Sequence, residues 1–219
     1  MARILITGAE TGLGLALAHA FIDAGDSVAV LCRETSAELD ALAPEIYHGV
    51  DVTNAAAVYR AAAEMGDAAI DVLINNAGIM IEDDIDRIDI AAVRLQFEVN
   101  ALAPLNIALA FRRRLRAGSK LINISSRLGS IGDNDSGDDY GYRMSKAAQN
   151  MFTSNLATEL GKKGIIVAAL HPGIVATGMT GGKGTSADQA AENLKSVIDG
   201  LTVEKSGGFY SWSGDTLPW

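Results

Sequence analysis

Short runs of apolar residues alternate along the chain with longer segments whose apolar residues recur every three or four positions. The short runs are rich in isoleucine, valine and leucine, and several are apolar at nearly every position. Strands of a parallel sheet have this pattern because helices cover both faces of the sheet. Strands are predicted over residues 3–8, 27–32, 46–52, 70–78, 119–126, 164–173 and 207–214.

The segments between these runs are predicted to be helices. They follow the first strand to about residue 24 and then cover 36–42, 55–65, 89–115 and 141–161. Since crossovers between parallel strands are right-handed, the alternation of strands and helices gives a doubly wound sheet. The prediction is therefore an α/β fold of the Rossmann type, with one parallel sheet and helices on both of its faces.

No internal repeat and no long linker divides the chain, so residues 1–219 are expected to form a single domain. Two loops follow predicted strands, the acidic segment 129–139 and the glycine-rich segment 177–186. Both are expected to be mobile, and the second is expected to contribute to a small lid around 177–190. Loops at the carboxyl ends of strands are where ligands bind in open α/β sheets.

Charge and composition exclude several classes of partner. The chain carries a formal net charge of −9, and its longest basic run is the three arginines at 112–114. This balance argues against nucleic acid or an anionic membrane surface as the main partner. No stretch approaches about 18 apolar residues without a charge, so no membrane span is expected.

The single cysteine, Cys32, excludes an intrachain disulfide and fits a reducing compartment. The opening residues lead directly into a strand without a signal-peptide pattern, so a cytoplasmic location is expected. The chain has three scattered histidines, and no pair of them has the spacing of metal ligands on a helix, so no metal site is predicted. These histidines are His19, His48 and His171.

A glycine-rich turn, "TGAETGLG" at residues 7–14, stands between the first strand and the first helix. Gly8 permits a sharp turn, Gly12 lets the backbone approach a phosphate, and Gly14 lets the helix pack closely on the sheet. The helix N-terminus then faces the phosphates, where its free N–H groups and its dipole favour negative charge. The turn predicts a dinucleotide site.

The segment "DDYGYRMSK" at 138–146 contains two tyrosines and one lysine. In a helix, Tyr142 and Lys146 are four residues apart and share a face. Tyr140 is six residues from Lys146 and points away from it, so Tyr140 is expected to be a bystander. Taken alone, this spacing also fits an ordinary helix start with a half-buried aromatic side chain and a solvated lysine.

Seven motifs in order resemble those of the short-chain dehydrogenase/reductase family, over residues 3–181. They are "TGAETGLG" (7–14), "DV" (51–52), "NNAG" (75–78), the asparagine of "FEVNALAP" (97–104), "NISS" (123–126), "YRMSK" (142–146) and "HPGIVAT" (171–177). The closing "GGFYSWSGDTLPW" (207–219) resembles a branch of the family, the C-factor-like and sniffer-type carbonyl reductases.

The resemblance implies an active site of Asn100, Ser126, Tyr142 and Lys146. It also implies a nicotinamide dinucleotide held by the glycine turn and by the segments at the ends of the other strands. The implied cofactor-binding residues are Gly8, Thr11, Gly12, Leu13, Gly14, Arg33, Asp51, Val52, Asn76, Ala77, Gly78, Tyr142, Lys146, Pro172, Gly173, Val175 and Thr177.

In this reading Tyr142 gives a proton to a carbonyl oxygen, or takes one from an alcohol in the reverse direction. A free phenol has a pKa of about 10, and the ammonium of Lys146 is expected to favour the phenolate. Ser126 is expected to hydrogen-bond the same substrate oxygen. By resemblance, Lys146 also binds the nicotinamide ribose, and Asn100 holds a water that links the lysine to solvent.

Each of these residues also has a structural reading. Ser126, or Ser125 beside it, can satisfy the backbone at the end of a strand, and Asn100 can bond to a neighbouring loop.

The choice of nicotinamide cofactor depends on the end of the second strand. The family's NAD-dependent members place an aspartate seven residues after Gly25, where this chain has Cys32 followed by Arg33. A guanidinium can hold a 2′-phosphate that a carboxylate would repel, so NADPH/NADP+ is preferred. NADH/NAD+ stays possible because Thr11 is neutral and Glu10 lies beside it, and Arg33 can also simply cap the strand end.

The expected function is NADPH-dependent reduction of a ketone or aldehyde to an alcohol, reversibly. The alternatives are an NAD-dependent secondary-alcohol dehydrogenase and a non-enzymatic signalling protein that binds nucleotide. The expected partner is a small carbonyl or alcohol substrate. By resemblance, a homodimer or homotetramer would form through helices 89–115 and 141–161.

Ser126 and Tyr142 are sixteen residues apart, more than the family usually shows. The extra residues fall in the acidic loop, whose carboxylates either flank the substrate mouth and disfavour anions or lie on a solvated surface. They are Asp133, Asp135, Asp138 and Asp139.

Overall fold

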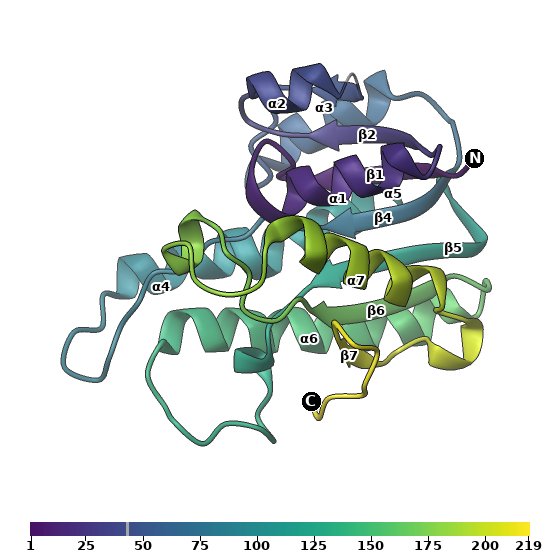
Figure 1. Ribbon diagram of the computed structural model, residues 1–219. Coiled ribbons are helices and arrows are strands. Elements are labelled where there is room, and N and C mark those ends of the chain that lie inside the picture. Colours follow the sequence, from purple (N-terminus) through teal and green to yellow (C-terminus); the bar gives the residue numbers. More distant parts are fainter. Residues whose placement is uncertain (43) are drawn as a thin grey trace.

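Seven parallel strands form one sheet in the computed structural model, which describes residues 1–42 and 44–219 (Figure 1). Their order across the sheet is β3-β2-β1-β4-β5-β6-β7, so the chain winds in opposite directions from β1. The strands are β1 (Arg3–Thr7), β2 (Ser27–Leu31), β3 (Glu45–Tyr47), β4 (Ile70–Asn75), β5 (Leu115–Ile124), β6 (Ile166–His171) and β7 (Phe209–Ser211). The predicted doubly wound α/β fold is confirmed.

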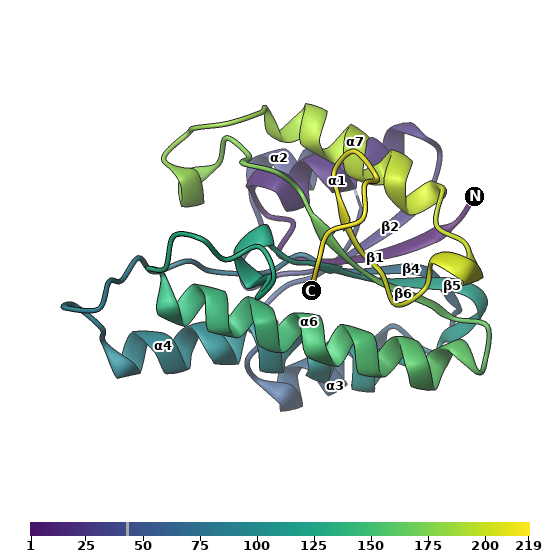
Figure 2. The same cartoon turned by 90° about the horizontal axis from the view of Figure 1, so that it is seen from below.

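Helices cover both faces of this sheet (Figure 2). They are α1 (Gly12–Asp23), α2 (Ala37–Ala41), α3 (Ala55–Glu64), α4 (Ile90–Phe97), α5 (Ala103–Phe111), α6 (Tyr140–Gly161) and α7 (Ala187–Asp199). Helices α1 and α7 pack on one face, and α3, α5 and α6 pack on the other.

Alternate residues of each strand enter the two halves of the core. In β1, Ile4 and Ile6 face α1 and α7, whereas Leu5 faces the opposite layer. All three are at most 1% exposed, and burial of each such side chain contributes about 1.5–3 kcal/mol. The near-continuous apolar runs of the sequence follow from this burial on both faces.

The predicted continuous helix over 89–115 is wrong in two respects. A π-helical turn, Glu98–Leu102, separates α4 from α5, and Leu115 already belongs to β5. Pro104 explains the turn, because it has no N–H to donate to the carbonyl of Asn100. The backbone instead closes a wider ring, in which Ala103 N–H donates to the carbonyl of Glu98.

Helix α7 is absent from the predicted elements. Its N-terminus is capped by Ser186, whose hydroxyl accepts the N–H of Gln189 at 3.3 Å. Four apolar residues on one side of α7 are buried against α1: Ala190, Ala191, Leu194 and Ile198. The spacing of these apolar residues and the serine cap indicate a helix from the sequence, although the charged residues between them make the pattern weak. Across the described part of the chain, no helix has the length and apolar character to cross a membrane.

Candidate active site

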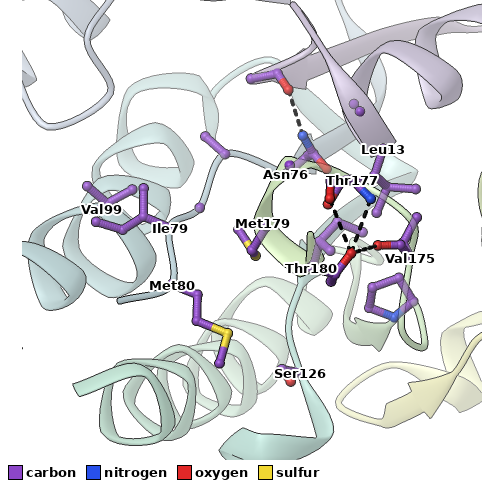
Figure 3. Close-up of a pocket in the computed structure, with 18 of the residues that line it drawn as sticks. Leu13, Asn76, Ile79, Met80, Val99, Ser126, Val175, Thr177, Met179 and Thr180 are labelled. Carbon is purple, nitrogen blue, oxygen red and sulfur yellow. Dashed lines mark hydrogen bonds between the residues drawn. The ribbon is translucent and has the colours of Figure 1, made fainter. Parts of the chain in front are cut away.

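A cavity of about 1280 Å³ opens at the carboxyl ends of the strands, beside the point where the strand order reverses at β1 and β4. Figure 3 shows residues from the turns after β1, β4, β5 and β6 converging on it. All seventeen predicted cofactor-binding residues line this cavity. Of the four predicted catalytic residues, Ser126, Tyr142 and Lys146 line it and Asn100 does not.

The glycine turn packs directly against the segment that follows β4. A Cβ at Gly8 would lie 3.0 Å from the Cα of Ala77, and one at Gly14 would lie 2.1 Å from the carbonyl oxygen of Gly8. Asn76 Nδ2 donates to the carbonyls of Thr7 and Gly8, at 3.1 and 2.8 Å. Gly8 and Gly12 both have positive φ, which side chains rarely adopt.

Helix α1 begins at this turn without a side-chain cap. Its N-cap residue, Thr11, makes no capping hydrogen bond, in contrast to Asn54 at the start of α3. The first N–H groups of α1 are therefore available to an anion. The uncapped N-terminus of α1 and the glycine turn at residues 7–14, called the glycine cradle below, fit the pyrophosphate of a dinucleotide. The residues present therefore fit the predicted cofactor.

Helix α6 carries Tyr142 and Lys146 on one face, as their spacing predicts. Lys146 Nζ lies 5.8 Å from the centroid of the Tyr142 ring. The amine donates to the carbonyl of Ile124 at 2.8 Å and to Oε1 of Gln149 at 3.1 Å. A primary ammonium has three N–H donors, so one is left for a ligand.

The protein's own groups raise the pKa of Tyr142 to about 12, mainly through burial. A hydrogen bond with the side chain of Ser126 acts in the opposite direction, and the charge of Asp139 adds to the rise. Burial also lowers the pKa of Lys146 to about 7. Burial is the main influence on this phenol, and the effect of Lys146 on its acidity stays a prediction.

Ser125 and Ser126 have different surroundings. Ser125 Oγ donates to Oδ1 of Asn150 at 2.6 Å, within the buried interface between β5 and α6. Ser126 Oγ accepts the N–H of Leu128 at 3.2 Å. Ser126 thus satisfies a backbone group at the end of β5, as in the structural reading, and it also lines the cavity, whereas Ser125 bonds a side chain.

Asn100 lies behind the cavity wall and is fully buried. Its Oδ1 accepts the N–H of Ile79 at 2.9 Å, and its Nδ2 donates to the carbonyl of Ile79 at 2.8 Å and to Oγ of Ser145 at 3.0 Å. Both amide protons thus bind protein atoms. The water that the resemblance assigns to Asn100 stays a prediction.

The opposite end of the cavity presents charges of both signs. Hydrogen bonds from Thr53 lower the pKa of Asp51, and the charge of Arg33 lowers it further. Within the described residues, Glu10 Oε2 is buried without a hydrogen-bond partner. Cys32 is 2% exposed, and burial, followed by the charge of Glu10, raises the pKa of its thiol to about 11. The thiol therefore stays protonated.

Apolar side chains that the sequence did not predict as site residues form much of the remaining wall. Leu95 in α4 and Val99 in the π-helical turn, four residues apart, line the cavity together with Met80 and Met179. Their helical spacing was the available signal for Leu95 and Val99. His171 also lines the cavity, and burial, with the charge of Arg127, lowers its pKa to about 4.

The acidic loop lies outside this wall. Among the residues that the structure describes, none of its four aspartates lines the cavity. Asp133 pairs with Arg127, and Asp138 pairs with Arg143 at 3.1 Å. Arg143 also donates to Ser136 at 2.8 Å, so the loop is tied to α6. These contacts favour the interpretation of the loop as a solvated surface segment over the interpretation that its carboxylates flank the substrate mouth.

Comparison with known proteins agrees with this geometry. The family model described as short chain dehydrogenase matches residues 2–188. The chain is 38% identical to 1-hydroxy-2-glutathionyl-2-methyl-3-butene dehydrogenase of Rhodococcus sp. (strain AD45), over the whole length of both chains. It is 40% identical to C-signal of Myxococcus xanthus, over 68% of this chain and 93% of that protein.

Two solved structures share the fold over their whole length. Carbonyl reductase Sniffer of D. melanogaster is 31% identical with a TM-score of 0.94, and each chain is fully covered. The NADPH-bound carbonyl reductase from chicken fatty liver is 30% identical with a TM-score of 0.91, covering 100% of this chain and 99% of that one. The resemblance found in the closing residues is confirmed by these matches.

Proposed function

The chain belongs to the short-chain dehydrogenase family, and we propose that within this family of NAD(P)-dependent oxidoreductases it is an NADPH-dependent carbonyl reductase. One observation carries the proposal. Ser126, Tyr142 and Lys146 line the same cavity as the glycine turn, and the Lys146 amine lies beside the Tyr142 ring, 5.8 Å from its centroid.

In the proposed reaction, bound NADPH supplies the hydride that reduces the carbonyl carbon. Ser126 Oγ–H donates a hydrogen bond to the carbonyl oxygen and stabilises the negative charge that develops there. Tyr142 Oη gives its proton to the same oxygen as this charge forms. Lys146 Nζ, beside the ring, stabilises the phenolate that remains. In alcohol oxidation Tyr142 takes the proton instead.

The preference for NADPH is part of the proposal. Arg33 lies at the adenosine end of the cavity, and the chicken carbonyl reductase, which shares the fold, binds NADPH. Glu10 and Asp51 line the same end and oppose a 2′-phosphate, so a modest preference is expected rather than strict exclusion of NADH.

A second candidate is oxidation of an alcohol that carries a large polar substituent. The observation that favours it is the Rhodococcus relative, a dehydrogenase by name whose substrate bears a glutathionyl group. Such a group is anionic, and the cationic residues that line the cavity include Lys183 and Arg127, the second of which also pairs with Asp133. A third candidate, a nucleotide-binding signalling protein, is favoured only by the likeness to C-signal.

Assembly into a dimer or tetramer is also proposed. Leu102 in the π-helical turn and Leu109 in α5 are seven residues apart and exposed, as are Met144 and Met151 on α6. Burying these side chains against a second copy would remove apolar surface from water. Light scattering on the wild type and on Leu102→Glu tests this, and a wild type that is monomeric at high concentration would contradict it.

The reaction is tested by following NADPH absorbance with a panel of ketones and aldehydes, and NADP+ or NAD+ reduction with the matching alcohols. The panel includes glutathionyl alcohols and aldehydes. Reduction of simple carbonyl compounds with NADPH supports the first candidate, and turnover confined to glutathionyl alcohols supports the second. Nucleotide binding without any turnover would overturn both and leave the signalling candidate.

A further inference from the structure

Two side-chain amides of the α4 region hold the segment 79–83 that follows β4. Asn100 pairs with both backbone groups of Ile79, at 2.9 and 2.8 Å. Gln96 does the same at Ile81: its Oε1 accepts the N–H at 3.0 Å and its Nε2 donates to the carbonyl at 3.2 Å. The two amides bind alternate residues of the segment, as the backbone of a neighbouring strand would; the two pairs are called rungs below.

The spacing of Gln96 and Asn100 along the helix explains why they can bind Ile81 and Ile79 along the extended segment. Residues 96 and 100 are four apart and share a helix face, and alternate residues of an extended segment point their backbone groups to one side. Gln96 and Asn100 are both 0% exposed. Buried backbone groups need partners, so without Gln96 the N–H and carbonyl of Ile81 would lose theirs.

The far end of this segment caps the helix that carries Tyr142. The carboxylate of Asp83 accepts the N–H groups of Tyr140 and Gly141, the second at 3.0 Å, and the Asp83 carbonyl accepts the N–H of Asp139 at 2.8 Å. Helix α6 has no cap of its own, since Asp139 at its N-cap is left-handed, with φ +43°, and makes no side-chain capping bond. Asp83 therefore supplies the cap from a distant segment.

Gln96 also contacts α6 itself. A Cβ at Gly141 would lie 2.4 Å from Nε2 of Gln96 and 3.2 Å from the Asp83 carboxylate. One buried amide thus lies between α4, the segment 79–83 and the first turn of α6, and Tyr142 is the next residue along that turn. Met80, between the two rungs, lines the cavity (Figure 3).

We infer that Gln96 is a positioning residue. It holds Ile81 in place and, through Asp83 in the same segment, the start of α6. In this way it sets the positions at which the Tyr142 phenol and the Met80 side chain contact the substrate. The kinetic part of this inference rests on the proposed function. The glycine turn is held separately, by the hydrogen bonds that Asn76 donates to Thr7 and Gly8, so Gln96 does not contact the phosphate end of the cofactor site.

The test compares Gln96→Met, which keeps the size of the side chain but loses both hydrogen bonds, with Gln189→Met on the exposed side of α7. Gln96→Glu keeps the acceptor for Ile81 N–H, and Asp83→Ala at the half-buried end of the segment removes only the cap of α6. The readouts are amide hydrogen exchange of peptides 78–84 and 138–144, kcat and KM for a carbonyl substrate, and the Kd of NADPH.

For Gln96→Met, both peptides should exchange faster and kcat should fall on the order of 10- to 100-fold, because small displacements of reacting groups are costly. The Kd of NADPH should stay within about twofold of wild type, as for a residue outside the cofactor site. Asp83→Ala should accelerate exchange in 138–144 and lower kcat in the same direction. Gln96→Glu should be impaired at least as much as Gln96→Met, because it places a buried carboxylate against the carbonyl of Ile81 and near Asp83, and Gln189→Met should match wild type.

Unchanged exchange in both peptides, or faster exchange with a wild-type kcat, would overturn the inference. A wild type that turns over no carbonyl compound would refute the proposed function, while the exchange measurement would still decide whether Gln96 holds the segment.

Discussion

Replacement of Gly14 by alanine tests how closely the glycine turn is packed. A Cβ at this position would lie 2.1 Å from the Gly8 carbonyl and 2.5 Å from Asn76 Nδ2, whereas ordinary contact begins at 3.4 Å. Gly14 must therefore move by about 1.3 Å from the Gly8 carbonyl within the turn, and by about 0.9 Å from the Asn76 amide in the segment after β4. Such a movement disrupts both hydrogen bonds that Asn76 donates to the turn.

The cost can be worked from these contacts. Overpacking of a tight site costs about 1–3 kcal/mol, and two lost hydrogen bonds cost about 1–3 kcal/mol together. Gly14→Ala should therefore lower the free energy of unfolding by about 2–6 kcal/mol, out of a total of about 5–15 kcal/mol for a typical domain. Because the cradle opens, the Kd of NADPH should rise by about tenfold or more.

Gly161→Ala is the matched control. Gly161 lies in α6, has no atom within 4 Å of the position of a new Cβ, and does not have positive φ. Alanine there should be neutral or stabilise by up to about 1 kcal/mol. Urea unfolding followed by circular dichroism, with and without NADPH, measures both variants. A Gly14→Ala protein as stable as Gly161→Ala, with wild-type affinity for NADPH, would refute the packing described for the turn.

Three further predictions follow from the site. Arg33→Ala should weaken binding of 2′,5′-ADP more than binding of 5′-ADP, whereas Glu10→Gln should strengthen binding of 2′,5′-ADP. Calorimetry measures both affinities, and equal effects on the two nucleotides would contradict the assignment of Arg33 and Glu10 to the 2′-phosphate. Ser126→Ala should lower kcat by about 10²–10³-fold, as for removal of an oxyanion donor, whereas Ser125→Ala should chiefly lower stability; steady-state kinetics and urea unfolding separate them, and reversed effects would exchange their roles. The pKa of Lys146 is about 7 in the folded protein against 10.5 for the free side chain, so the unfolded chain binds more protons between these values. The free energy of unfolding of wild type, relative to that of Lys146→Met, should therefore rise as the pH is raised from 7 to 10.5 and fall again as the pH is lowered towards 7. Urea unfolding of both proteins at several pH values measures this difference. A difference that does not change with pH would show that the amine is not buried.

Features that depend on a few neighbouring residues could be predicted from the sequence. The strands are visible because burial on both faces makes them almost wholly apolar, and Gly8, Gly12 and Gly14 mark the turn because their spacing meets a backbone requirement. Tyr142 and Lys146 share a face for the same local reason, and the structure places both at the cavity.

Features that depend on distant segments could not be predicted in this way. The contacts of Gln96 are with Ile81, fifteen residues away, and nothing in the local pattern distinguishes this glutamine from an exposed one. The acidic loop looked like a candidate for the substrate mouth because its pairing with Arg127 and Arg143 appears only in three dimensions. The raised pKa of Tyr142 has the same origin, since its main cause is burial by the whole fold.

The central claim is that the phenol of Tyr142 exchanges a proton with the substrate oxygen. Single-turnover reduction of a carbonyl compound by Tyr142→Phe, with NADPH affinity measured in parallel, tests it most directly. The rate of the chemical step should fall by about 10²–10⁴-fold, as for loss of a general acid, while NADPH binds with nearly wild-type affinity. A Tyr142→Phe protein that reduces the carbonyl compound at the wild-type rate would contradict the claim.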